Sequence, residues 1–249
     1  MYRYALTIEY DGSPFHGWQV QNSITTVQGV VFDAIKKLDM NCENFVGAGR
    51  TDAGVHAIGQ VAHVDLATKR DCETVQKAIN YYLNKYPVSI LNARLVNNQF
   101  HARFSAIKRH YIYKIFSRKT DLTFEKNQYW HVRHSLNKSN MQLAANYLTG
   151  RHDFSAFRSS ICQASSPIKT IDTISIQSEE IRDGVVYQLN FSAKSFLHHQ
   201  VRSIVGCLEK VGCGKWEAKK VQEILLSKDR SRCAALAPSG GLYLARIDY

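Results

Sequence analysis

Tyr2-Arg3-Tyr4-Ala5-Leu6-Thr7-Ile8-Glu9-Tyr10 is the stretch from which the fold of this 249-residue chain is worked out. Large apolar or aromatic side chains occupy its even positions, and the polar Arg3, Thr7 and Glu9 fall between them. A period of two is typical of a strand with one buried face. We therefore predict a half-buried strand over residues 2–10, ended by a turn at Asp11-Gly12-Ser13-Pro14.

Outward from this strand, hydrophobic periodicity predicts further elements. A helix capped by Thr25 or Thr26 comes first, because apolar side chains from Val27 to Leu38 keep a 3.6-residue spacing. The elements after it are a short apolar piece at 45–48, a strand at 60–66, a helix at 74–86 stopped by Pro87, and a strand at 88–96. The order βαββαβ is that of a ferredoxin-like fold.

The second half of the chain repeats this order loosely. Its predicted elements are a strand at 111–116, a helix at 139–149, a hairpin from 168–177 to 185–193 across Arg182-Asp183-Gly184, helices at 197–211 and 216–226, and a strand at 242–249. Residues 118–135 and 151–167 are expected to be mostly irregular. Because no Pro- or Gly-rich linker separates the halves, we expect an α+β protein with two ferredoxin-like subdomains, 1–100 and 101–249. These would share one continuous, mixed and mainly antiparallel sheet with helices packed on it.

Composition limits the class of partner. The net charge of +11 favours an anionic partner such as nucleic acid, and 13 tyrosines suit a surface that also meets bases. The six cysteines form no CxxC pair, which argues against a zinc ribbon or a secreted disulfide framework. With neither a signal-peptide pattern nor an apolar run of membrane-spanning length, we expect a cytoplasmic protein with no membrane partner.

One carboxylate stands out in the chain. Residues 46–57, VGAGRTDAGVHA, place Asp52 among three glycines and three alanines, two positions from Arg50. So many small residues leave space around the acid, which favours a catalytic carboxylate on a loop over a tight turn with an exposed aspartate. No complete dinucleotide fingerprint, Walker A loop, HExxH, zinc-deaminase or GxSxG motif occurs. The absence of these motifs predicts that no cofactor is needed. Adjacent His198 and His199 would diverge by about 100° on a helix, so we also predict that they bind no metal.

Two other residues are ambiguous by themselves. Arg202 lies on the predicted 197–211 helix beside its apolar ridge, where an arginine is ordinarily a solvated side chain. Tyr111 shares a strand face with Tyr113, and both suit a core or a sheet surface.

The chain resembles the TruA-type tRNA pseudouridine synthases nearly from end to end. The motifs that carry the resemblance are YDG at 10–12 with FxGWQxQ at 15–21, GAGRTDAGVHA at 47–57 with GQV at 59–61, FHARFSA at 100–106 with RxYxY at 109–113, GxHDF at 150–154, FLxxxVRxxVG at 196–206, and APxxGL at 237–242. The resemblance implies two ferredoxin-like subdomains around a central basic cleft. It also implies that Asp52 is the catalytic aspartate, that Tyr111 stacks on the target base, and that Arg202 is the ion-pair partner of Asp52.

By the same resemblance, the substrate is uridine at positions 38, 39 and 40 in the anticodon stem-loop of tRNA, and the enzyme is a homodimer. Asp52 could attack C1′ of the ribose or take a proton from C2′. The uridine must first be turned out of its stack, at a cost of a few kcal/mol. Arg50, two residues from the acid, could hold the displaced RNA backbone.

Three alternatives remain. A non-catalytic RNA-binding protein built on RRM-like sheets would explain the charge and the tyrosines, although the RNP1 pattern is missing. A glycosidase acting on nucleic acid normally needs a second carboxylate, and Asp52 has no acidic neighbour in its loop. A paralogous pseudouridine synthase would keep the same residues and modify other uridines.

Overall fold

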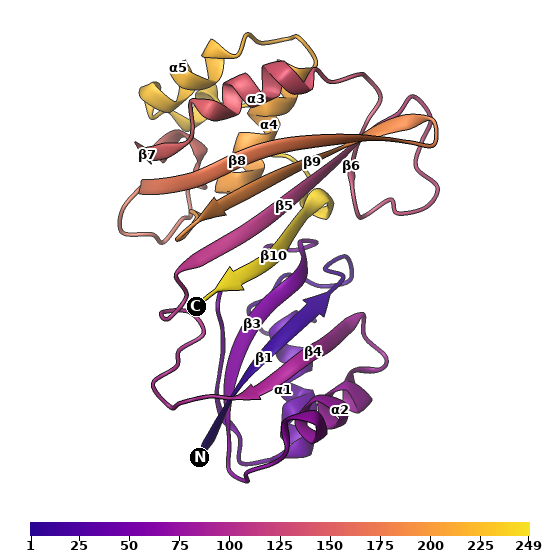
Figure 1. The fold of residues 1–249 in the computed structure, drawn as a ribbon, viewed down its shortest axis with the longest axis vertical. Helices are drawn as coiled ribbons and strands as arrows, with labels where there is room; N and C mark the ends of the chain where they lie inside the picture. Colours follow the sequence, from indigo (N-terminus) through magenta and orange to yellow (C-terminus); the bar gives the residue numbers. More distant parts are fainter. The chain divides into compact units, whose positions relative to one another are not determined.

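The computed structural model describes residues 1–249 as two compact units (Figure 1). The first unit comprises Met1–Ile107 with Tyr243–Tyr249, and the second comprises Lys108–Leu242. The chain has ten strands, mostly antiparallel to their neighbours, and five α-helices. The predicted α+β class is confirmed. None of the helices is both long enough and apolar enough to span a membrane.

The first unit has the predicted βαββαβ order. Its elements are β1 (Tyr2–Tyr10), α1 (Val27–Leu38), β2 (Glu43–Gly47), β3 (His56–Leu66), α2 (Cys72–Leu83) and β4 (Val88–Leu95), joined by the last strand, β10 (Leu242–Asp248). The strand order is β4-β1-β3-β10, with β2 also paired to β3. All pairs are antiparallel except β3 with β10, where Tyr243 lies opposite His56. In Figure 1, α1 and α2 lie together on one face of these strands.

Local sequence explains these elements. Tyr4, Leu6 and Ile8 of β1 are completely buried, and Glu9 is exposed, as the alternation predicts. Of the two candidate caps for α1, Thr26 is the one used, because its hydroxyl accepts a hydrogen bond from Gly29 N at 3.3 Å.

The second unit has the strand order β5-β9-β8-β7. Its elements are β5 (Lys108–Ser117), β6 (Trp130–Val132), α3 (Lys138–Asn146), β7 (Gly150–Asp153), β8 (Ile168–Ile181), β9 (Gly184–Ala193), α4 (Gln200–Gly212) and α5 (Lys219–Ser227). The main strands pair antiparallel, and β6 pairs parallel with β5. The predicted hairpin turns at Arg182-Asp183, with Arg182 in the left-handed region at φ 55°.

Three details differ from the prediction. The short strands β6 and β7 lie in stretches expected to be irregular, because three or four residues are too few to show a period. Helix α4 begins at Gln200 rather than at 197, since His199 before it has φ 68°. His198 and His199 therefore precede the helix, and their ring centroids lie 4.0 Å apart. The expectation that the two rings diverge on a helix was wrong.

Candidate functional site

Asp52 lies in the loop of residues 48–55 that joins β2 to β3. Its side chain is half-buried, whereas the neighbouring Arg50 and Ala53 are exposed and Thr51 is buried. A carboxylate in this position is accessible to a substrate and is also partly shielded from water.

Hydrogen bonds from the segment after β1 fix the loop on both sides of Asp52. On one side, Trp18 N donates to Thr51 O at 3.0 Å, and on the other, Gly54 N donates to Phe15 O at 3.3 Å. Backbone hydrogen bonds of this kind fix the direction in which the intervening side chain points. The FxGWQxQ motif thus serves to position the loop that carries Asp52.

Two glycines permit this close approach. Gly17 has φ +87°, and a Cβ on it would lie 2.6 Å from Thr51 O. A Cβ on Gly12 would lie 2.0 Å from Val55 O. Any other residue at either position would push the loop away from the segment behind it.

Side chains complete the attachment of the loop. The Tyr10 hydroxyl and Thr51 Oγ1 are 2.8 Å apart in a buried hydrogen bond. Gln60 Nε2, from β3, donates to Gly49 O at 2.9 Å. The loop is therefore bonded to β1, to the segment that follows β1, and to β3, and Asp52 projects from a preorganised backbone.

His56 connects this arrangement to the last strand. Its Nδ1 accepts a hydrogen bond from Gly12 N at 3.0 Å, and its ring stacks on Tyr243 with centroids 4.7 Å apart. His56 is buried. His56 thus supports the loop that carries Asp52, which explains its presence near the end of the GAGRTDAGVHA motif.

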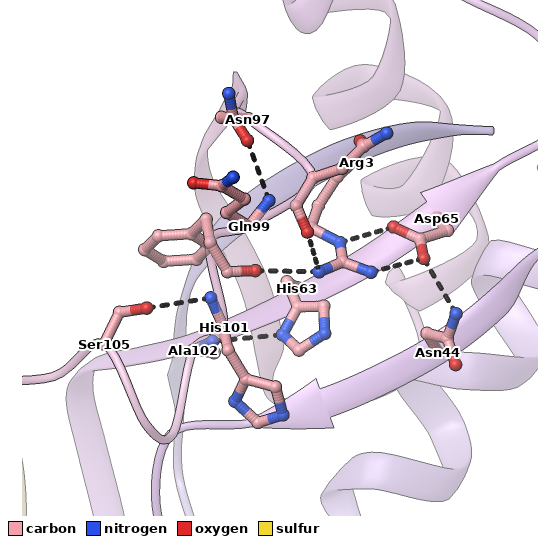
Figure 2. A network of polar contacts seen from close by, with 11 residues as sticks. Arg3, Asn44, His63, Asp65, Asn97, Gln99, His101, Ala102 and Ser105 are labelled. Carbon is pink, nitrogen blue, oxygen red and sulfur yellow. Dashed lines mark hydrogen bonds and ion pairs between the residues drawn. The ribbon is translucent and has the colours of Figure 1, made fainter.

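A second polar network in the first unit fixes the FHARFSA motif, as Figure 2 shows. Arg3 forms a bidentate pair with Asp65 at 2.7 Å for each bond, and it also donates to Phe100 O at 2.9 Å. His63 Nδ1 accepts a hydrogen bond from Ala102 N at 3.1 Å. The hydrogen bond from Arg3 lowers the pKa of Asp65. Burial lowers the pKa of His63 to about 4, and the nearby charges of Arg3 and His101 act in the same direction.

Tyr111 lies on β5 of the second unit, opposite Phe191 of β9. It is half-buried, and its ring meets Phe196 edge to face at 5.2 Å. Tyr113, on the same strand face, is fully buried and donates to Pro238 O at 2.7 Å. Burial raises the pKa of Tyr113. The two tyrosines that periodicity could not separate are therefore different: Tyr113 is a core residue, and Tyr111 keeps part of its ring accessible.

Arg202 lies in the first turn of α4 and is half-buried. Its Nε donates to Ala237 O at 2.8 Å, and its own carbonyl accepts from Ala237 N at 3.3 Å. The alternative of a freely solvated helix arginine does not hold. Arg202 and Tyr113 together bond the Ala237-Pro238 part of the APxxGL motif.

The structure thus places Asp52 and Arg50 in one loop of the first unit, and Tyr111 and Arg202 in the second unit. Sequence reasoning missed the supporting roles of Tyr10, Trp18 and Gln60 and the ring of Phe196. A signal for them was present, because each lies in one of the short motifs quoted above, but spacing alone did not reveal that they contact the loop or the ring.

Known proteins are similar to this chain over most of its length. A family model described as tRNA pseudouridine synthase matches residues 6–105 and 144–249. A protein named tRNA pseudouridine synthase A from Maricaulis maris (strain MCS10) is 49% identical over 100% of this chain and 98% of its own. Proteins of the same name from Parvibaculum lavamentivorans and Xanthobacter autotrophicus are 49% and 47% identical, each over 100% of both chains.

Proposed function

The chain belongs to the tRNA pseudouridine synthase family, and from that premise we propose that it isomerises uridine to pseudouridine in the anticodon stem-loop of tRNA, at positions 38, 39 and 40, with Asp52 as the catalytic carboxylate. The observation that carries the residue assignment is the Asp52 loop itself. Its backbone is fixed by hydrogen bonds on both sides of the acid, while the side chain remains partly accessible. A loop that only connected β2 to β3 would not require such support.

The reaction needs few protein groups because it is an isomerisation. The N1–C1′ bond of the nucleoside breaks, a C5–C1′ bond forms to the same base, the C5 proton is lost and N1 gains one. Asp52 acts either by attack on C1′, which gives a covalent ester, or by removal of the C2′ proton, which gives a glycal. Both routes require the carboxylate to be ionised.

The other three residues bind and orient the substrate. Tyr111 stacks on the extruded base, which offsets the cost of unstacking it. Arg202 pairs with the Asp52 carboxylate and favours its ionised form. Arg50, exposed beside the acid, contacts the displaced phosphate backbone. By resemblance to the family, the active enzyme is a homodimer, and sedimentation of the purified protein would test this.

The test is to incubate the full chain with an unmodified tRNA transcript and to map pseudouridine by chemical labelling and primer extension. Asp52→Asn is expected to lower turnover at least about 100-fold while tRNA binding and the melting temperature stay close to those of the wild type. Asp33→Asn is the matched control, because Asp33 is an exposed carboxylate on α1 of the same unit. Turnover in Asp52→Asn equal to that in Asp33→Asn would refute the assignment.

The products distinguish the alternatives. Pseudouridine at 38, 39 and 40 supports the proposal, whereas pseudouridine elsewhere identifies a paralogous specificity. Release of free uracil would indicate a glycosidase, and binding without reaction would indicate an RNA-binding protein. A substrate deuterated at C2′ would separate the two chemical routes, since a primary isotope effect is expected only where the C2′–H bond breaks.

A further inference from the structure

The C-terminal end of α4 brings together three side chains that the proposed reaction does not use. They are His134, from the loop after β6, and Glu209 and Cys213, from α4 and its C-cap. One nitrogen, oxygen or sulfur atom of each lies within 4.8 Å of those of the other two. We propose that this cluster binds a divalent transition-metal cation, with zinc as the best match, through His134 Nε2, a Glu209 carboxylate oxygen and Cys213 Sγ.

The positions of the three residues follow from the backbone. Glu209 and Cys213 are four residues apart and face the same side of the helix end, where Cys213 N donates to Glu209 O at 2.9 Å. Ser117 Oγ donates to His134 O at 2.7 Å, which fixes the third residue against the sheet. The cluster therefore exists before any ion arrives, and binding need not order a flexible loop.

The loop is also bonded to the helix itself. Asn137 N donates to Gly212 O at 2.8 Å, next to Cys213, and the Tyr187 hydroxyl donates to Leu136 O at 2.6 Å. The first bond keeps the loop of His134 close to the end of α4, and the second holds the same loop against β9.

The charge in the cluster favours a cation. The Glu209 side chain is 3% exposed, and its Oε1 is 2.8 Å from His134 Nε2. Its Oε2 is buried and accepts no hydrogen bond, although Lys210 Nζ lies 3.0 Å away as an ion-pair partner. The Lys210 ammonium therefore balances the charge of Glu209, while the lone pairs of Oε2 that accept no hydrogen bond stay open to a metal ion. The carbonyl end of the helix adds negative potential.

The distances suit a small tetrahedral ion. Zinc bonds of about 2.0–2.3 Å to nitrogen, oxygen and sulfur put ligand atoms roughly 3.3–3.7 Å apart. The ligand atoms of all three residues already lie within 4.8 Å of one another. His134 Nε2 and Glu209 Oε1, hydrogen-bonded at 2.8 Å, separate by about half an ångström to reach this spacing. A thiol ligand disfavours magnesium and calcium, which prefer oxygen ligands. Three protein ligands leave a fourth position for water.

Binding of the metal ion displaces protons and the Lys210 ammonium from the three ligand side chains. Cys213, whose thiol donates to Lys210 O at 3.4 Å, loses its proton to solvent. The proton that His134 Nε2 directs at Glu209 is also given up, and the neutral imidazole then binds the ion through Nε2 with its one proton on Nδ1. The Lys210 ammonium, whose side chain is 33% exposed, turns toward water. The ion then links the loop after β6 to the end of the helix that carries Arg202 in its first turn.

Cobalt substitution tests the proposal without any activity assay. The full chain, stripped with a chelator that is then removed, is titrated with CoCl₂ and followed by absorption. One equivalent is expected to give a thiolate-to-cobalt charge-transfer band and the strong visible bands of tetrahedral cobalt, both lost when ZnCl₂ displaces it. Excess MgCl₂ is expected to have no effect. A titration without a charge-transfer band at one equivalent would overturn the proposal.

Matched variants locate the ion. Cys213→Ser is expected to abolish the charge-transfer band, and His134→Gln to weaken Co²⁺ and Zn²⁺ binding at least about tenfold. Cys233→Ser is the control, because Cys233 is another half-buried thiol of this unit and lies beside Cys207 rather than in the cluster. A band that persists in Cys213→Ser and disappears in Cys233→Ser would refute the site. Far-ultraviolet circular dichroism of each variant checks that it folds.

Discussion

Replacement of His63 by asparagine should change how the stability of the first unit depends on pH. His63 is 2% exposed, and its Nδ1 accepts a hydrogen bond from Ala102 N. That bond requires the lone pair on Nδ1, so the native network of Figure 2 favours the neutral ring. Asparagine places an oxygen where Nδ1 was and cannot be protonated. It therefore keeps the acceptor and removes the titration.

The magnitude follows from the shift in pKa. His63 has a pKa of about 4 in the folded chain, against a reference value of 6.5. Between these two values the unfolded chain takes up a proton that the folded chain does not, so protonation favours unfolding as the pH falls. The stability from neutral His63 is complete above pH 6.5 and lost as the pH drops through about 4. At about 1.4 kcal/mol per pKa unit, the loss at pH 4 is about 3 kcal/mol.

The assay is urea unfolding of wild type and His63→Asn from pH 7.5 to pH 4, with amide hydrogen exchange of peptides from β1 and β3 to report the first unit. At neutral pH the variant should be less stable by about 1–2 kcal/mol, because a smaller side chain replaces a buried ring. Near pH 4 the order should reverse, since the wild type alone has lost about 3 kcal/mol. His16→Asn, which alters an exposed histidine of the same unit, should parallel the wild type. If His63→Asn also ran parallel to the wild type, the reasoning about His63 would be refuted.

Three further outcomes are expected. Tyr111→Phe should retain tRNA affinity, whereas Tyr111→Ala should lose about 1–3 kcal/mol of binding measured by filter retention, because the role proposed for Tyr111 is to stack its ring on the base; equal losses would assign the role to the hydroxyl. Gly17→Ala should destabilise the protein by about 1–2 kcal/mol, seen as a lower melting temperature, and should also reduce turnover, because the added Cβ would lie 2.6 Å from Thr51 O. An active, fully stable variant would contradict the positioning role of Gly17. With a net charge of +11, tRNA affinity should fall at least about tenfold from 50 to 200 mM salt, and a flat salt dependence would exclude a phosphate-dominated interface.

Periodicity was sufficient for the regular part of the first unit. Strand β1 and helix α1 follow from spacing and one N-cap, because their burial patterns are set by residues close together in sequence. The pairing of β10 with β3 has no such local signal. Tyr243 and His56 are far apart in sequence and meet only in the folded chain. The sequence of β10 itself contains no pattern that predicts which strand it pairs with.

The same distinction applies to the site. The sequence alone predicts Asp52 as the catalytic candidate, because an acid among small residues is a local pattern. It could not separate Tyr111 from Tyr113, since both occupy one face of one strand, and only tertiary packing buries the second against Pro238. The start of α4 was placed too early because a left-handed residue such as His199 leaves no trace in hydrophobic spacing.

The motifs around Asp52 show why one acid is accompanied by so many fixed positions. Gly12, Gly17 and Trp18 contribute no acid, base or nucleophile, yet each lies against the backbone of the loop at hydrogen-bond or van der Waals distance. A reaction that depends on a single carboxylate gains little from additional chemical groups and much from correct placement of that one group. Most residues of the recognisable pattern are therefore expected to tolerate chemical change poorly for geometric reasons. Their variants should lose turnover in proportion to how far they move Thr51 and Asp52.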